Sequence, residues 1–312
     1  MAPDTQSVRA LVLGGYGINC DLETEYAFHC AGARADRVHI NDLIGGRVTL
    51  RDYHILALIG GFAWADDHGA GVILATKLRH HLGDAILEFV AAGSFVIGIC
   101  NGFQALANLG LLPGFTPGTF RREVALTYND CGNFRNQWVH LKIEESPCVF
   151  TAGLSALDLP IRHGEGKFIA GPDVLARLQG GRQIVMRYAK TNGEPAQGAF
   201  PWNPNGSLED IAGICDPSGR IFGLMPHPEA FNHPTNHPDW SRRKWTASRR
   251  ATTRARQGAA QDARQGVQQD LPHGAARGAP QGSLGSAQQV DGVVGQDGIA
   301  LFRNVVEAAK RI

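Results

Sequence analysis

Short apolar segments alternate with amphipathic segments through the first 110 residues, and this alternation limits the folds open to the chain. The apolar segments are residues 8–13, 37–40, 54–59 and 94–99. The segments with helical spacing are residues 22–31, 71–92, with a break expected near Gly83, and 102–109. Strands that alternate with helices favour a parallel sheet covered by helices on both faces. We therefore predict an α/β fold with a mainly parallel central sheet.

The second half of the chain has a different pattern, dominated by strands. The predicted strands after Arg121 are residues 123–127, 138–143, 183–188, 211–215 and 221–225. Few helical segments separate them, so these strands add to the sheet without the strand–helix alternation of the first half.

An abrupt change in composition marks residues 241–290. This segment has nine Lys+Arg against two Asp+Glu, a net charge of +7, whereas the other 262 residues carry 21 against 27, a net charge of −6. Only five of its 50 residues are large apolar residues. Such a segment buries too little apolar surface to offset the entropy lost on ordering. We predict a domain over 1–240, a disordered basic insert over 241–290 and a C-terminal element over 291–312.

The C-terminal element has the spacing of a buried helix. Ile299, Phe302, Val306 and Ala309 fall on one helical face, and Asp297 stands where it could cap the start of the helix. We expect this helix to pack back on the domain formed by residues 1–240.

A cysteine follows directly on the apolar strand 94–99 and precedes a helix. Cys100 has Gly98 and Gly102 on either side, as a tight strand–turn–helix elbow requires. A thiolate at a helix N-terminus is favoured by the helix dipole, and the N–H of Asn101 would face an oxyanion. A lone cysteine here is more often structural, but the two glycines and the following Gln104 favour a nucleophile.

Two further motifs fit the chemistry of a nucleophile. His227 and Glu229 are two residues apart between prolines, which predicts an extended segment with both side chains on one side. Glu229 would then orient the imidazole as in a catalytic triad. Gly61, in the glycine pair after strand 54–59, offers a second N–H to an oxyanion. Taken alone, the first motif equally fits a rigid loop and the second an ordinary turn.

The six cysteines are scattered, and none forms a C-x-x-C pair. The first seven residues lack the pattern of a secretory signal, and no apolar stretch is long enough for a membrane helix. We therefore expect a cytoplasmic protein with free thiols, no membrane association and no bound metal.

Together these motifs resemble the class I (triad) glutamine amidotransferases. The resemblance rests on Gly60-Gly-Phe62, Gly98-Ile-Cys-Asn-Gly-Phe-Gln104 and Gly223-Leu-Met-Pro-His-Pro-Glu229. More narrowly, the chain is similar to the glutaminase subunits of phosphoribosylformylglycinamidine synthases. The segments that carry this similarity are Gly17-Ile-Asn-Cys-Asp21, His163-Gly-Glu-Gly-Lys-Phe168 and Asn203-Pro-Asn-Gly-Ser207. The resemblance implies a three-layer αβα, flavodoxin-like fold.

The resemblance also implies roles for individual residues. Cys100 would be the nucleophile, His227 the general acid and base, and Glu229 its orienting group. The amides of Gly61 and Asn101 would form the oxyanion hole. The residues that would seat glutamine are Gln104, Asn129 and Phe134. The pair His163 and Glu165 would act in glutamine positioning or partner contact.

By the same resemblance the chain would hydrolyse L-glutamine and pass ammonia to a large synthetase subunit. That partner would use ATP and magnesium to convert formylglycinamide ribonucleotide in purine biosynthesis, and a small third subunit often accompanies such pairs. No cofactor would bind to this chain itself.

Two alternatives remain at this point. The chain could serve another triad amidotransferase system or be a related cysteine hydrolase. It could also be a binding protein that acts through the basic insert, whose nine cations would support weak, salt-sensitive nucleic-acid binding. Trp245 is the sole aromatic residue of that insert, which argues against specific recognition of single strands.

Overall fold

The structure is a computed structural model that describes residues 7–246, 249 and 298–312. The chain forms two units, one of Met1–Asn232 with Gln296–Ile312 and one of His233–Gly295. Most of the predicted insert, and Asp297 as well, lie outside the described residues. In the second unit, a 3-10 turn η6 (Pro234–Asn236) is capped by His233.

No helix in the described part of the chain is long and apolar enough to cross a membrane.

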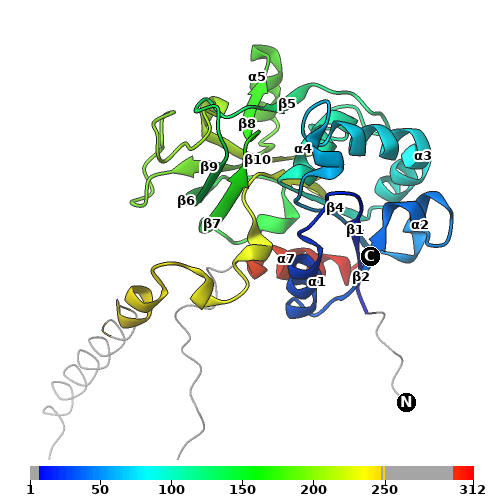
Figure 1. Cartoon of the computed structure of the whole chain (residues 1–312), viewed down its shortest axis with the longest axis horizontal. Coiled ribbons are helices and arrows are strands. Elements are labelled where there is room, and N and C mark those ends of the chain that lie inside the picture. Colours follow the sequence, from blue (N-terminus) through cyan, green and yellow to red (C-terminus); the bar gives the residue numbers. More distant parts are fainter. Residues whose placement is uncertain (1–6, 247–248, 250–297) are drawn as a thin grey trace, which may run out of the picture. The chain divides into compact units, whose positions relative to one another are not determined.

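A nine-stranded sheet forms the centre of the first unit (Figure 1). Its parallel part is, in spatial order, β2 (Arg34–His39), β1 (Arg9–Gly14), β3 (Ile55–Leu58), β4 (Phe95–Ile99) and β11 (Ile221–Leu224). Its antiparallel part continues with β10 (Ile211–Cys215), β9 (Ile184–Ala189), β6 (Arg135–Ile143) and β7 (Ala156–His163). The parallel sheet predicted for the first half is confirmed, and the extra strands of the second half extend it at one side. β5 (Val124–Thr127) and β8 (Lys167–Ala170) form a separate antiparallel pair.

Helices cover both faces of the parallel part. α1 (Asp21–Cys30) and α7 (Ile299–Ala309) pack together on one face, and α3 (Val72–Ala91) and α4 (Asn101–Leu109) lie on the other (Figure 1). Short helices α2 (Ile40–Ile44) and α5 (Pro172–Gly180) follow β2 and β8. The layers are those of the predicted three-layer αβα fold.

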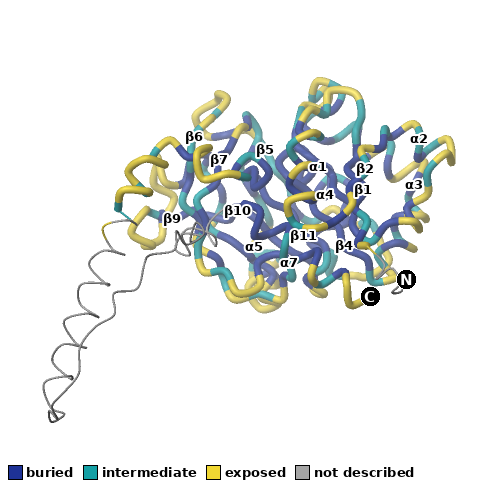
Figure 2. The backbone as a smooth tube through the Cα atoms, turned by 90° about the horizontal axis from the view of Figure 1, so that it is seen from below, coloured by how far each residue is buried: buried dark blue, intermediate teal, exposed yellow. Residues whose placement is uncertain are grey.

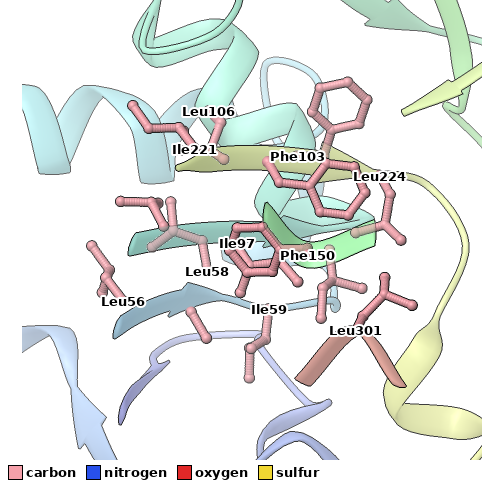
Figure 3. Close-up of a cluster of buried hydrophobic side chains, with 14 of the residues drawn as sticks. Leu56, Leu58, Ile59, Ile97, Phe103, Leu106, Phe150, Ile221, Leu224 and Leu301 are labelled. Carbon is pink, nitrogen blue, oxygen red and sulfur yellow. The ribbon is translucent and has the colours of Figure 1, made fainter. Parts of the chain in front are cut away.

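The core lies between these layers. Leu56, Leu58 and Ile97 come from β3 and β4, Phe103 from α4 and Leu301 from α7, and all belong to one buried cluster that extends over both faces of the sheet (Figure 3). Figure 2 shows the strands as the most deeply buried part of the backbone and the outer loops as exposed. Burial of this apolar surface is the main stabilising term for the unit.

The break expected near Gly83 does not occur, because α3 is continuous from Val72 to Ala91. Its buried side chains Leu78, Leu82, Ile86 and Phe89 continue the same face on both sides of the glycine. A glycine inside a helix costs only about 1 kcal/mol relative to alanine, which the packing of this face offsets.

The C-terminal helix has the buried face that its spacing predicts. Ile299, Phe302, Val306 and Ala309 are all buried, and the Phe302 ring packs edge-on against Phe28 of α1 with 4.9 Å between centroids. The N–H of Gly298, at the start of α7, donates to the carbonyl of Phe231 at 2.8 Å. This contact places α7 against η5 (Pro228–Ala230), the turn that carries Glu229.

Candidate active site

Cys100 occupies a strained elbow between β4 and α4. Its backbone has φ 51° and ψ −105°, a conformation uncommon for a residue other than glycine. A side chain at Gly102 would collide with the backbone of Leu58 in β3, so the helix can start this close to the sheet only with glycine there. The sequence prediction of a tight strand–turn–helix turn is therefore confirmed.

The parallel pairing of β4 with β11 brings the cysteine and the histidine to the same edge of the sheet. Ile99 is opposite Leu224 in the register, and the N–H of Cys100 donates to the carbonyl of Leu224 at 2.8 Å. His227 follows Leu224 by three residues. Residues separated by more than 100 positions thus meet because their strands are neighbours.

His227 and Glu229 form a buried pair. Nδ1 of His227 lies 2.6 Å from Oε1 of Glu229, and the side chains are 2% and 0% exposed. The predicted extended segment is wrong beyond His227, since Pro228 begins the 3-10 turn η5. Proline fits the first position of such a turn because its missing N–H would have no acceptor there. The turn still brings the two side chains together.

The environment of His227 favours a protonated imidazole. Burial alone would lower the pKa of His227, but attraction to Glu229 and interactions with Cys100 and Cys20 outweigh it and raise the pKa well above its usual value. Nε2 of His227 is buried without a hydrogen-bond partner among the described side chains and backbone groups. An imidazole held at Nδ1 with Nε2 free can pass a proton to and from a reacting group.

The Gly60–Gly61 turn lies beside the elbow. Gly61 has φ 149°, and a Cβ there would lie 2.7 Å from the carbonyl oxygen of Gly17, so the position requires glycine. The side chain of Asn101 accepts from the N–H of Ala63 at 3.1 Å and so ties α4 to the loop after this turn. The N–H of Asn101 is the first of α4 and has no acceptor within the helix.

Cys100 lines a cavity of about 210 Å³. Gly61, Phe62, Gln104 and Phe134 also line it. A larger hollow of about 430 Å³ lies along α3, and no cysteine or carboxylate is among the residues that line it. The cavity at Cys100 is lined by the cysteine that the sequence predicts to be a nucleophile.

Charged groups at this cavity are Asp66, Arg162 and Glu165. Burial raises the pKa of Asp66 to about 6, partly countered by a hydrogen bond from Asn101, and the nearby Glu165 adds to the rise. Two carboxyl groups thus lie close together, and Arg162, whose backbone carbonyl lies 3.6 Å from Sγ of Cys100, is the basic residue of the lining.

Known proteins are similar to this chain in sequence and in overall fold. Residues 7–257 match the CobB/CobQ-like glutamine amidotransferase domain family. A phosphoribosylformylglycinamidine synthase subunit PurQ of Methanococcus maripaludis is 46% identical over 243 residues, which cover 77% of this chain and 89% of the relative. The PurQ subunit of Dehalococcoides mccartyi is 45% identical over 234 residues, 75% of this chain and 89% of the relative.

The chain belongs to the PurQ family. A solved structure described as PurLQS from Thermotoga maritima is also similar, with a TM-score of 0.59 and 30% sequence identity. The match covers 75% of this chain and 94% of that one. Both the fold and the resemblance inferred from the motifs are thus confirmed.

The three predicted glutamine-seating residues of this PurQ-family chain have different surroundings. Gln104 lines the cavity and donates from Nε2 to the carbonyl oxygen of Glu165. Phe134 lines the cavity as well, half-exposed, with its ring 6.1 Å from that of Phe62. Asn129 is buried and is not among the lining residues; its amide instead binds the segment that begins at His163. Their roles stay predictions.

Cys20 is a residue of the site that the sequence analysis did not single out. Its Sγ lies 4.0 Å from Nδ1 of His227, and burial raises the pKa of its thiol despite a lowering contact with His227. Cys20 lies in the segment Gly17-Ile-Asn-Cys-Asp21, which carries part of the family resemblance. Nothing in the local sequence of this segment indicates that Cys20 lies beside a histidine more than 200 residues away.

Cys20, His227 and Glu229 each offer a ligand atom, and these atoms lie within 4.8 Å of one another. A metal at this point would need Nδ1 of His227 as a ligand, and that nitrogen is hydrogen-bonded to Glu229. We assign these atoms to the orientation of His227.

Proposed function

We propose that this chain is the glutaminase subunit of a phosphoribosylformylglycinamidine synthase and hydrolyses glutamine to glutamate and ammonia. The observation that best supports this function is the position of Cys100, in a strained conformation at the edge of the sheet where the buried His227–Glu229 pair also lies. Membership of the PurQ family supports the same activity and assigns it to purine biosynthesis.

The first half-reaction forms a thioester. The Cys100 thiolate attacks the side-chain carbonyl carbon of glutamine, and the N–H groups of Gly61 and Asn101 stabilise the oxyanion that forms. Removal of one such donor typically costs about 3–4 kcal/mol of transition-state stabilisation. Protonated His227 gives its Nε2 proton to the amide nitrogen, the C–N bond breaks, and ammonia leaves.

The second half-reaction releases glutamate. Neutral His227 takes a proton from water, whose oxygen attacks the thioester carbon. The C–S bond then breaks, the thiolate of Cys100 reforms beside protonated His227, and glutamate departs. Glu229 keeps the Nδ1 proton in place throughout and stabilises the imidazolium.

The charges of the cavity suit a free amino acid. Asp66 and Glu165 would attract the α-ammonium group of glutamine, and Arg162 its α-carboxylate. Burial raises the pKa of Asp66, and a bound ammonium group would lower that pKa again by stabilising the carboxylate. Gln104 and Phe134 line the same cavity and stay proposed contacts to the substrate.

The ammonia would be used by a partner. The relatives are named as subunits of a synthase, and the similar structure is named PurLQS. We propose that this chain acts with a large synthetase subunit, which binds ATP and magnesium, and with a small third subunit. The chain itself would need no cofactor. We place the reaction in the cytoplasm, which suits its six free cysteines.

Replacement of the nucleophile tests this function in the assembled complex. Cys100→Ala should abolish glutamine-dependent synthesis and glutamine hydrolysis but retain synthesis driven by added ammonium salt. Cys30→Ala is the matched control, because Cys30 is an exposed thiol at the end of α1. Normal glutamine hydrolysis by Cys100→Ala would overturn the proposal, and loss of the ammonia-driven reaction would contradict the transfer of ammonia to a partner.

A further inference from the structure

His163 is the last residue of β7, and its imidazole is buried. One ring nitrogen has a hydrogen-bond partner in the described chain and the other has none. Its side chain is 2% exposed, and Nδ1 lies 3.0 Å from Oδ1 of Asn129. The amide nitrogen of Asn129 donates to the carbonyls of His163 and Asn133, so Oδ1 is the acceptor and Nδ1 carries the proton. Nε2 is therefore a hydrogen-bond acceptor, and no group in the described chain donates to it.

The imidazole of His163 is neutral at working pH. Burial, followed by repulsion from a positive charge on His227, lowers the pKa of His163 to about 3. A buried acceptor without a donor costs free energy, and such groups in native proteins are rare. A cost of this kind at the edge of a cavity points to a ligand that supplies the donor.

The backbone around His163 is built to hold this ring. A side chain at Gly166 would collide with the imidazole, so only glycine lets the chain pass this close. The N–H of Gly166 donates to Oδ1 of Asn129 at 3.0 Å, the same oxygen that holds Nδ1. The segment His163-Gly-Glu-Gly166 and Asn129 thus fix the ring before any ligand arrives.

His163 also belongs to the cavity of Cys100. It lines that cavity, and Sγ of Cys100 lies 3.6 Å from the carbonyl oxygen of the preceding residue, Arg162. We propose that Nε2 of His163 accepts a hydrogen bond from the carboxamide N–H of bound glutamine and then from the ammonia that leaves. This inference rests on the proposed glutaminase activity and deepens it.

The proposed contact distinguishes an amide from other acyl groups. The carboxamide of glutamine has N–H donors that an ester or a ketone at the same position lacks, and a buried acceptor selects strongly for the ligand that satisfies it. His163 has its one proton on Nδ1, bound to Asn129, so it accepts from ammonia and gives it no proton. His163 therefore does not convert the ammonia to ammonium, and uncharged ammonia is the nucleophilic form.

Two substitutions distinguish the role of Nε2 of His163 as a hydrogen-bond acceptor from the contribution of the side chain to the fold. His163→Asn keeps a donor near the position of Nδ1, facing Asn129, and removes the acceptor at Nε2. His163→Gln places an amide oxygen near the position of Nε2. His80→Asn, at an exposed histidine on α3, is the matched control.

The experiment compares substrates with and without N–H in the assembled complex. We expect His163→Asn to lower kcat/KM for L-glutamine by roughly tenfold or more and to change it less than about threefold for the γ-methyl ester of L-glutamate. The rate at which 6-diazo-5-oxo-L-norleucine, which has no carboxamide, labels Cys100 should likewise change little. His163→Gln should recover most of the glutamine activity.

Two outcomes would overturn this role of His163, and a third would refute the activity on which it rests. An equal loss of rate with all three compounds would show that His163 only supports the fold, and a lower Tm would accompany that loss. An unchanged kcat/KM for glutamine would show that Nε2 meets only a water. A wild-type complex that processes none of the compounds would instead refute the proposed glutaminase function itself.

Discussion

His227 and Glu229 are joined by a 2.6 Å contact between Nδ1 and Oε1, and both side chains are buried. A carboxylate at this distance accepts a hydrogen bond from the Nδ1–H group, which leaves Nε2 to take up or give a proton in the reaction. Because the pair lies away from water, the orientation of the imidazole depends on this contact, on Cys20 at 4.0 Å from Nδ1, and on the surrounding packing.

Glu229→Gln should lower kcat for glutamine hydrolysis by about 10²- to 10⁴-fold with little change in KM. An amide can donate to Nδ1, which would move the imidazole proton to Nε2 and remove the base. Steady-state kinetics of the assembled complex measure the effect, with Glu307→Gln on the exposed side of α7 as control. A kcat within about threefold of wild type would remove Glu229 from this role.

The raised pKa of Asp66 predicts a pH dependence of stability. Because the native pKa is about 6 against an ordinary 3.8, the native state favours the protonated carboxyl group. The stability associated with this group is present below pH 3.8 and is lost as the pH rises through about 6. Asp66→Asn should therefore stabilise the protein at pH 8 by about 1 kcal/mol, a figure reduced for the screening of a half-exposed group.

The same substitution should weaken substrate binding, since it removes a carboxylate proposed to meet the α-ammonium group. Urea unfolding at pH 5 and pH 8 measures the first effect, and KM for glutamine the second. Asp67→Asn, at a neighbouring exposed carboxylate, is the control. Lower stability at pH 8 with an unchanged KM would contradict both expectations.

Gly60→Ala should damage the site more than the fold. The new Cβ would lie 2.7 Å from Cε1 of His227 and 3.0 Å from Sγ of Cys20, so the ring must move. Misplacement of a catalytic group by about 1 Å costs up to about 100-fold in rate, and overpacking costs about 1–3 kcal/mol of stability. Gly180→Ala, where nothing lies within 4 Å, is the control. Wild-type kcat in Gly60→Ala would show that His227 tolerates displacement.

Phe302→Ala should destabilise the folded unit by about 3–5 kcal/mol, the usual cost of removing a buried phenylalanine side chain. The ring is fully buried and packs on Phe28, so its loss leaves a cavity between α7 and α1. Denaturant unfolding measures the change, and the exposed Glu307→Ala on the same helix should shift it little. A loss below about 1 kcal/mol would mean that α7 contributes little to the unit.

Elements with strong local patterns were predictable from sequence. The strand before Cys100, the glycine-flanked turn and the face of α7 each depend on residues close together in the chain. β7, β8 and α5 were not predicted, because β7 contains a proline and charged residues, β8 has only four residues, and α5 buries only Leu178 and so has a weak apolar face. Pro160 lies inside β7, for example, and a proline argues against a strand unless the strand is at the edge of its sheet, as β7 is.

The residues of the site also divide into those that local sequence motifs predict and those that only the folded structure reveals. Cys100, His227 and Glu229 could be proposed from motifs because each motif is short and its geometry local. Cys20, Asp66 and the free Nε2 of His163 became visible only when separate loops met around the cavity. None of these three lies in a segment whose spacing indicates its neighbour.

The amino-acid sequence alone determined part of the local geometry: which strongly patterned segments are strands or helices, where a glycine permits a sharp turn, and that the side chains of His227 and Glu229 can meet. The tertiary structure decided which of these segments are neighbours. The pairing of β4 with β11 brought Cys100 and His227 together, and Asn129 and Gly166 fixed the tautomer and orientation of His163. Apolar periodicity specifies the face that a segment buries but not the partner that covers it, because burial is nondirectional.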